Sequence, residues 1–350
     1  MERYSVGSDE DEQAVMRSTG GARSGVDTLR DGYYGMPVIH KPHWKWLIIW
    51  YFYLGGISGA SYALASIAQL VRAPDADRIA RAGRYISLAA LLPSPALLIL
   101  DLGRPERFHH MLRVVNFRSP MSLGTWILSA FGAFCGLSAA QQVARDGVLG
   151  SSGPLPRLLS SLPHRTIGAA GIAPALLTSG YTGVLLAVTA VPLWTKNHLL
   201  MGPLFLASSL SNATAAITLA LSLRRDTPRA TLQRLERLDT FSLMAELWLL
   251  LLNQARLGPV LGRPLQTGSV GRVYRFGVLG AGISLPLALQ VRAQRRGHAS
   301  RAATALTSAL VLLGGFGFRY VIIMAGHSSA DDPQATFELT GKPKELKDRG

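Results

Sequence analysis

The feature that most constrains this chain is a series of apolar runs with almost no charge, such as 167–194 and 302–325. A helix of about 20 apolar residues is long enough to cross the hydrocarbon core of a bilayer. Because hydrocarbon offers no hydrogen-bond partners, a spanning segment must satisfy its own backbone, and strand-like alternation is absent from these runs. The chain of 350 residues is therefore predicted to be an all-α membrane protein and not a pair of soluble domains.

The apolar runs predict eight transmembrane helices within residues 44–327, between a polar N-terminal arm at 1–43 and a polar tail at 328–350. Pro93 and Pro95 lie in the middle of the second helix, which should be kinked or locally unwound. The predicted helices cover 44–71, 85–100, 123–143, 167–193, 199–223, 241–252, 273–291 and 303–325.

The loops between the predicted helices carry unequal positive charge. The four loops on one side of the membrane hold 16 Lys and Arg residues, and the three on the other side hold 9. Loops rich in Lys and Arg stay in the cytoplasm. With an even number of helices, both termini and the loop 101–120 are therefore predicted to lie on the outer side.

Composition excludes several classes of function. The net charge of +15 does not indicate nucleic-acid binding, because the arginines flank the apolar runs and do not form one soluble face. The single cysteine, Cys135, argues against a disulfide framework and against a Cys-based zinc site or iron–sulfur cluster held by this chain alone. No histidine lies in the middle of a predicted helix, so no haem or other metal site is expected, and no flavin or phosphate-binding motif stands out.

The most distinctive local pattern follows the second predicted helix. Residues 101–108 read DLGRPERF, and residues 118–126, at the start of the third helix, read RSPMSLGTW. Glycine and proline in the first segment favour a tight turn, in which Asp101 can pair with Arg104 or Arg107. Serine followed by proline in the second segment is a good helix start. From the residues alone, a rigid ion-paired turn explains the pattern as well as a binding site does.

These two segments are similar to the hallmark of the NrfD/PsrC family, the polysulfide reductase-like membrane subunits. The similarity extends over nearly the whole sequence, from residue 32 to residue 333. Further segments that resemble the family are 33–35 with 44–46 and 53–56, 181–186 with 191–194, and 319–320 with 330–333.

The resemblance implies two four-helix bundles in the bacterial cytoplasmic (inner) membrane, with a pocket for an exchangeable menaquinone or ubiquinone near the outer surface. The partners it implies are a four-cluster ferredoxin-like iron–sulfur subunit and a molybdopterin-type catalytic subunit. The chain would then exchange electrons between the iron–sulfur subunit and the quinone pool, without a complete active site of its own. A non-catalytic membrane anchor and a transporter are the alternative functions.

By the same resemblance, several side chains are candidates for the quinone site. Asp101 would lie near the head group and exchange a proton or orient a donor, and Arg104 would stabilise negative charge on the reduced quinone. Tyr181 would donate a hydrogen bond to a quinone carbonyl, and His43, just before the first predicted helix, is a further candidate contact. Trp46 and the other aromatic residues of that helix either wall the quinone slot or form an interfacial belt. A plain salt bridge and an interfacial anchor are the structural alternatives for Asp101–Arg104 and Tyr181.

Glu246 is an ionisable residue inside the sixth and shortest predicted helix. A carboxylate at that depth is costly and is usually functional, and the helix that carries it should face protein and not lipid. Glu246 either belongs to a proton-transfer path or forms an ion pair with Arg319, which also lies within an apolar run.

Overall fold

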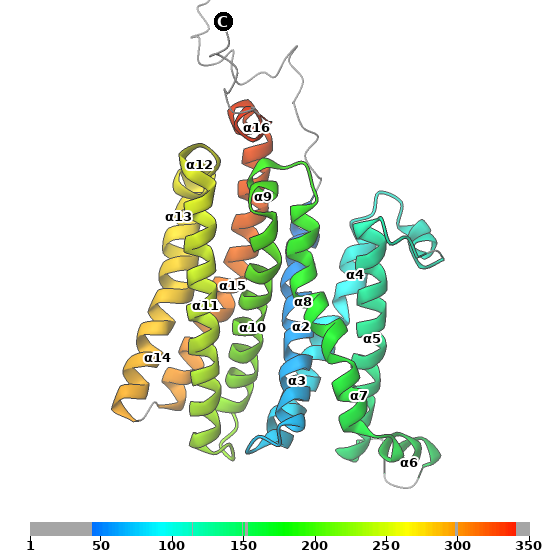
Figure 1. The fold of residues 1–350 in the computed structure, drawn as a ribbon. Coiled ribbons are helices and arrows are strands. Elements are labelled where there is room, and N and C mark those ends of the chain that lie inside the picture. The colour runs from blue at the N-terminus through cyan, green and yellow to red at the C-terminus, as the bar shows by residue number, and fades with distance from the viewer. Residues whose placement is uncertain (1–43, 114, 149, 151–152, 298–299, 341–350) are drawn as a thin grey trace, which may run out of the picture.

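The computed structural model describes residues 44–113, 115–148, 150, 153–297 and 300–340. Within these ranges every regular element is a helix. The axes of the long helices lie side by side and roughly parallel to one another (Figure 1). α16, the last described element, lies at the end of the molecule where α2 begins.

Proline and serine residues mark several helix starts in the first half of the sequence. Ser119 is the N-cap of α5, where its hydroxyl accepts a hydrogen bond from the backbone N–H of Ser122 at 3.4 Å, and Pro120 occupies the first helical position. The elements of this half are α2 (Trp46–Leu70), α3 (Ala76–Leu91), α4 (Pro93–Leu100), the 3₁₀-helix η2 (Pro105–Leu112), α5 (Pro120–Arg145), α6 (Pro154–Ser161), α7 (His164–Ala170), α8 (Ile172–Ala187) and α9 (Pro192–Lys196).

The second half contains a π-helical segment, η3, in a long helix that packs against α15. A Cβ added to Gly314 of α15 would lie 2.4 Å from the Cα of Gly282 in η3, so the two backbones touch and require glycine on both sides. The elements of this half are α10 (His198–Ser222), α11 (Arg229–Leu261), α12 (Arg263–Gln266), α13 (Gly268–Arg272), η3 (Val273–Ser284), α14 (Leu285–Arg296), α15 (Arg301–Ala330) and α16 (Pro333–Thr340).

Seven helices of the described ranges are long and apolar enough to cross a membrane, which confirms a multi-pass helical membrane protein. The remaining long helix, α11, is not among the seven. It has 33 residues, and its first half carries Arg234, Glu236, Arg237 and Asp239. The predicted helix 241–252 covers only the apolar middle of α11. That prediction was wrong in length because the helix continues through charged residues, two of which, Glu236 and Asp239, are buried in protein contacts.

The predicted second helix is interrupted at the proline pair, since α3 ends at Leu91 and α4 starts at Pro93, while Leu92 between them keeps helical dihedral angles (φ −51°, ψ −46°). The kink itself stays a prediction. Other predicted boundaries differ. α3 begins at Ala76, well before residue 85. Its first turns are charged, so hydropathy did not include them in the predicted helix. The predicted helix 167–193 is divided at Gly171 and ends at Ala187.

α10 occupies a central position. It contacts α2 and α8 from the first half of the sequence and α11 and α15 from the second (Figure 1). Its buried face contains the polar residues Ser208, Ser209, Ser211 and Asn212 as well as apolar ones. α15 extends to Ala330, and α16 follows within the region predicted as a polar tail.

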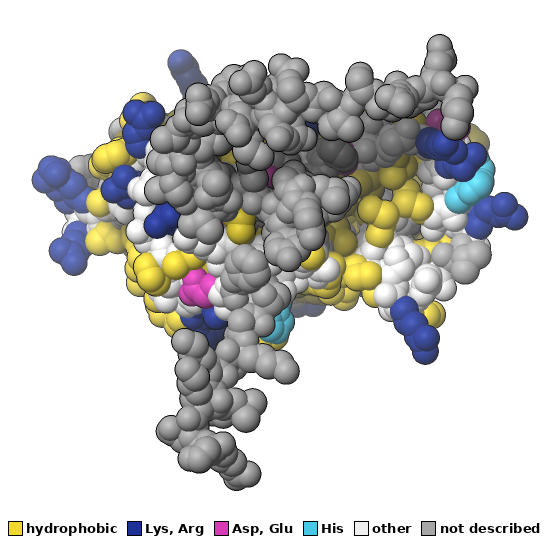
Figure 2. All heavy atoms as spheres, turned by 90° about the horizontal axis from the view of Figure 1, so that it is seen from above, with side chains coloured by type: hydrophobic (Ala, Val, Ile, Leu, Met, Phe, Trp, Pro, Cys, Tyr) yellow, Lys and Arg dark blue, Asp and Glu magenta, His cyan; other side chains and the backbone are white. Residues whose placement is uncertain are grey.

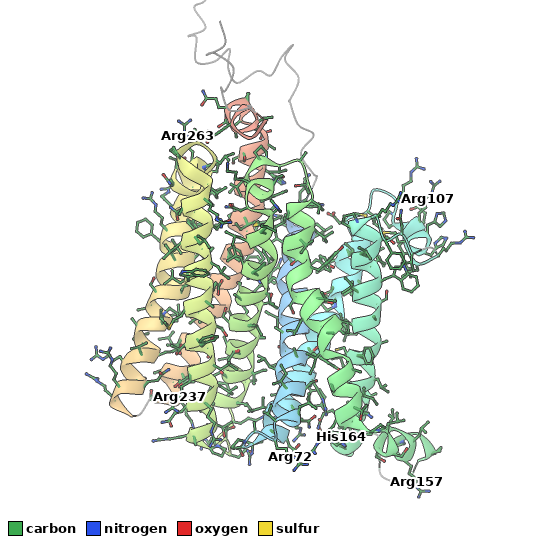
Figure 3. All side chains as sticks on the ribbon, viewed as in Figure 1. Arg72, Arg107, Arg157, His164, Arg237 and Arg263 are labelled. Carbon is green, nitrogen blue, oxygen red and sulfur yellow. The ribbon has the colours of Figure 1, made fainter. Side chains whose placement is uncertain are left out.

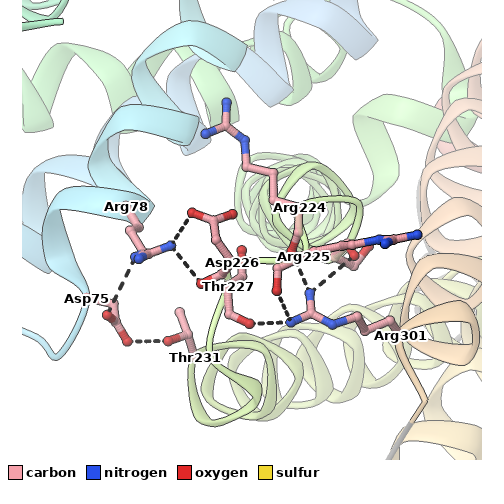
Figure 4. Close-up of polar contacts among 9 residues, drawn as sticks. Asp75, Arg78, Arg224, Arg225, Asp226, Thr227, Thr231 and Arg301 are labelled. Atoms are coloured by element: carbon pink, nitrogen blue, oxygen red, sulfur yellow. Dashed lines mark hydrogen bonds and ion pairs between the residues drawn. The ribbon is translucent and has the colours of Figure 1, made fainter.

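Polar contacts fasten the end of the molecule opposite α16 (Figure 4). Asp75, in the turn between α2 and α3, accepts a hydrogen bond from Thr231, and Arg78 donates to Asp226 at 2.7 Å. Arg301, at the start of α15, donates to several backbone carbonyls where α10 ends. Only the carbonyl of Ser222 belongs to α10, and those of Arg224, Arg225 and Thr227 follow it, so this guanidinium mainly fastens the turn between α10 and α11 to the start of α15.

Candidate functional site

The loop after α4 projects sideways from the helices at the end where α16 lies, and it carries Arg107 (Figure 3). Asp101 is half-buried at the C-terminal cap of α4, where its backbone N–H donates to the carbonyl of Leu97 at 3.2 Å. Arg104 is exposed just before η2. The structure therefore places both candidate residues at the junction of α4 and η2, and their ion pair stays a prediction.

Large apolar side chains are exposed around this loop. Leu100 is 61% exposed at the end of α4, Phe117 is 79% exposed, and Met121 is 55% exposed at the start of α5. Seen from this end of the molecule, hydrophobic side chains lie between Lys and Arg side chains at the periphery (Figure 2). Exposed apolar surface of this kind marks contact with lipid, a ligand or another protein.

Tyr181, on α8, contacts the start of α5. Its hydroxyl donates to the backbone carbonyl of Pro120 at 2.8 Å, and a Cβ on Gly124 would lie 2.9 Å from the tyrosine ring. The structure thus brings Tyr181 together with the 118–126 segment, so two of the motifs singled out in the sequence meet. The phenol of Tyr181 already donates its proton to a carbonyl, while the phenol oxygen can still accept a hydrogen bond.

The aromatic residues of the first helix form a cluster with α15. The ring of Trp50 lies 4.6 Å from that of Phe316, and Trp46 stacks on Phe316 and Tyr320 at 6.5 and 6.0 Å. Trp46 is 59% exposed, so the cluster is open on one side. His43 lies outside the described residues.

Glu246 and Arg319 meet through serine hydroxyls. Ser211 donates to the Glu246 carboxylate at 2.7 Å, and Arg319 donates to Ser208 and, at 3.1 Å, to Ser209. Ser208 also interacts with Glu246. Among the described contacts, the two charges therefore form a serine-bridged junction between α10, α11 and α15 and not the direct ion pair considered from the sequence.

Two further acids share the buried face of α11 with Glu246, and no sequence pattern had singled them out. Glu236 accepts a hydrogen bond from Thr304, and Asp239 accepts one from Gln290 at 2.6 Å. Glu236 and Asp239 are three residues apart, and Asp239 and Glu246 are seven apart. Both spacings place side chains on the same side of a helix, so all three acids share one face. That spacing was visible in the sequence, but the predicted helix began after both residues.

The described ranges contain no group of three or more His, Cys, Asp or Glu side chains that could hold a metal ion. What defines the class of this protein is its set of apolar helices: it is a multi-pass helical membrane protein. A family profile described as "Polysulphide reductase, NrfD" matches residues 38–329. The chain therefore belongs to the NrfD polysulphide reductase family.

Two relatives are similar to this protein over different lengths. One chain of the polysulfide reductase of Wolinella succinogenes is 28% identical over an alignment of 307 positions, which covers 81% of the present sequence and 94% of that relative. One subunit of the selenate reductase of Mesobacillus selenatarsenatis is 29% identical over 83 residues, which make up 24% of the present sequence and 19% of that relative.

Proposed function

We propose that this chain is the quinone-reactive membrane subunit of a multi-subunit oxidoreductase. In this role it exchanges electrons between an iron–sulfur subunit and the membrane pool of menaquinone or ubiquinone. The observation that carries the proposal is the family match over residues 38–329, together with an alignment that spans nearly the full length of a polysulfide reductase chain.

In this proposal α11 is the eighth membrane-spanning helix. Its uninterrupted part, residues 229–257, ends at a kink at Gly258 (φ 70°, ψ −172°). At about 1.5 Å per residue this part extends for about 43 Å, more than the hydrocarbon thickness of about 30 Å. Its acids Glu236, Asp239 and Glu246 are buried, and its exposed side carries Phe241 and Trp248, as a lipid-facing surface requires. The helices α2–α8 then form one four-helix bundle and α10–α15 the other.

The orientation follows from the distribution of arginine. The loops at the end opposite α16 carry most of the Lys and Arg residues, so the positive-inside rule assigns that end to the cytoplasm. The loop 101–120 and the α16 end then lie on the outer side of a bacterial cytoplasmic membrane.

The proposed quinone site lies at the outer ends of α4, α5 and α8. A quinone has a flat apolar ring and two carbonyl acceptors, so it needs an apolar surface flanked by donors. Exposed apolar residues surround the loop, Arg104 offers a cation for the reduced head group, and Asp101 offers a carboxylate for proton exchange. Tyr181 donates to a quinone carbonyl in exchange for its bond to Pro120. His43 is proposed as a further polar contact.

The expected partners are a four-cluster ferredoxin-like subunit and a molybdopterin-type catalytic subunit. Each relative is named as one chain or subunit of a reductase. These names support the proposal that the present protein also assembles with other subunits. The exposed loop after α4, with Arg104 and Arg107, offers a projecting surface on the side where these partners would dock.

Quinone-linked activity of the assembled complex tests the site. Tyr181→Phe and Asp101→Asn should each lower turnover with quinone while the subunits remain associated. Tyr62→Phe is the matched control, because it also removes a phenol-to-carbonyl bond, to Ile167 at 3.1 Å, but in the other half of the membrane. If both site variants assemble and turn over normally, the proposed pocket is in the wrong place. If a photoreactive quinone never labels this chain, the anchor function replaces the quinone-reactive one.

We assign Glu246 to proton transfer within the second bundle. Its support is a buried carboxylate whose contacts are hydroxyl groups that can relay protons, Ser211 and Ser208. Glu246→Gln preserves the shape of the side chain and should slow turnover and proton release after quinone addition. Unchanged values for both would show that Glu246 is structural.

A further inference from the structure

A polar hollow of about 440 Å³ lies at the end of the molecule opposite α16. Its walls come from the end of α2, the turn that leads into α3, and the start of α7. Figure 3 shows Arg72 and His164 at this end of the molecule. The hollow is far along the helices from the loop 101–120 and has no part in the proposed quinone site.

The acids of this hollow are engaged by their neighbours, whereas two of its arginines are not. Asp75 and Arg78 are held by the contacts of Figure 4, and Asp77 accepts a hydrogen bond from a neighbouring glutamine at 3.4 Å. Arg72 and Arg165 are exposed, and no described contact pairs either side chain with a carboxylate. The rim of the hollow therefore presents two guanidinium groups that can bind an anion.

A third arginine adds positive charge behind the wall. Arg84 is only 2% exposed, and it donates to Gln142 at 2.9 Å and to Gln69, which lines the hollow, at 2.6 Å. Its Nε has no hydrogen-bond partner. Gln69 and Gln142 donate in turn to Asp77 and Asp146, and no described salt bridge joins either acid to Arg84. A buried guanidinium without a carboxylate in contact is costly, so an anion in the hollow would offset part of that cost.

An apolar surface lies directly beside the hollow on the last turn of α2 and the residue after it. Ile67 is 39% exposed, Leu70 is 44% exposed and Val71 is 68% exposed. A free phosphate ion would use only the polar part of this surface, whereas a phospholipid would use both parts. The end of α2 also lies where a spanning helix leaves the hydrocarbon, which is the depth of lipid phosphates.

We propose that this hollow binds the phosphate of an anionic phospholipid, with Arg72 and Arg165 on the phosphate and an acyl chain along Ile67, Leu70 and Val71. Arginine suits this role because its planar donors match phosphate oxygens in pairs. Basic pockets between transmembrane helices are a recurrent form of anionic lipid site. The bound lipid fastens the start of α7 to the α2–α3 turn.

Native mass spectrometry of the full-length protein in detergent tests the proposal. The protein is incubated with phosphatidylglycerol or phosphatidylcholine of the same acyl chains, and bound lipids are counted. The wild type should retain phosphatidylglycerol preferentially. Arg72→Gln/Arg165→Gln should weaken that retention by about fivefold for each arginine removed, and leave phosphatidylcholine unchanged.

A matched pair controls for general charge. Arg157→Gln/Arg237→Gln removes the same two charges from exposed arginines at the same end of the molecule, outside the hollow (Figure 3). An equal loss in both pairs, or no preference in the wild type, overturns the proposal. Displacement of phosphatidylglycerol by equimolar inorganic phosphate would show that the site takes the free ion and not a lipid. Should the glutamine pair aggregate, Arg72→Lys/Arg165→Lys tests the same point, because lysine keeps the charge but lacks the paired donors. Retention of phosphatidylglycerol should fall partway, and unchanged retention would overturn the paired arginine–phosphate contact.

Discussion

Gly314 provides a direct test of how closely α15 and η3 are packed. A Cβ at Gly314 would lie 2.4 Å from the Cα of Gly282 and 3.1 Å from its carbonyl carbon. Both are backbone atoms and cannot rotate away, whereas non-bonded carbons pack at about 3.5–4.0 Å. Gly314→Ala must therefore move the two helices apart by about 1 Å.

The cost can be worked from two opposing effects. Overpacking of a well-filled interior costs about 1–3 kcal/mol. Alanine recovers up to about 1 kcal/mol relative to glycine because it is the better helix former. Because the clash is with backbone atoms, the upper part of this range, about 2–3 kcal/mol, applies to Gly314→Ala. The expected net change is then a loss of about 1–2 kcal/mol in the free energy of unfolding.

Gly132 on α5 is the matched control, because a Cβ there would have nothing within 4 Å. Gly132→Ala should therefore be neutral or stabilising, by up to about 1 kcal/mol. The assay is unfolding of the purified protein by SDS titration in one detergent. Unfolding is monitored by the change in tryptophan fluorescence. Gly314→Ala should lower the midpoint, whereas Gly132→Ala should leave it unchanged or raise it. A Gly314→Ala protein as stable as the wild type would refute the direct backbone contact.

Three further outcomes are expected from the structure. Ser119→Ala removes the N-cap hydroxyl of α5 and should lower the free energy of unfolding by about 1 kcal/mol in the same titration. Trp194→Phe removes the indole N–H that donates to the buried carbonyl of Ile322 at 3.0 Å, so it should cost about 1–3 kcal/mol, and a change within error would contradict that bond. The guanidinium of Arg78 donates to Asp226 and holds the pKa of that carboxyl below its usual value. A carboxyl with a lowered pKa stabilises the folded state above its unfolded pKa of about 4 and loses this effect as the pH falls through its folded pKa. The difference in melting temperature between the wild type and Asp226→Asn should therefore be present at neutral pH and disappear on acidification, and a constant difference would exclude this contact.

Hydropathy predicted the presence of the apolar helices better than where these helices end. The proline pair at 93 and 95 acts locally, by removing backbone donors, so the break after Leu91 could be predicted from the sequence. The early starts of α3 at Ala76 and α11 at Arg229 could not. Hydropathy averaged along the sequence indicates which segments prefer lipid. It does not indicate whether the charged residues next to such a segment are also helical because they pack against other helices.

The candidate site was predicted only in part, for a related reason. Glu246 and Arg319 stand out as charges within apolar runs, but their serine partners on α10 are ordinary helix residues in sequence. The bond from Tyr181 to Pro120 joins residues 61 positions apart, and it depends on how α8 packs on α5. Pairings of this kind follow from tertiary packing and leave no local pattern.

The serine-bridged junction also has a consequence for biosynthesis. The ribosome delivers helices in sequence order, so in the proposed eight-helix arrangement α10 and α11 enter the bilayer before α15 brings Arg319. Until then Glu246 must be neutral or sheltered, because a lone carboxylate in hydrocarbon is costly. Completion of this half of the protein is thus a late event that waits for the last long helix, and a nascent polypeptide stopped before it would be a substrate for membrane quality control.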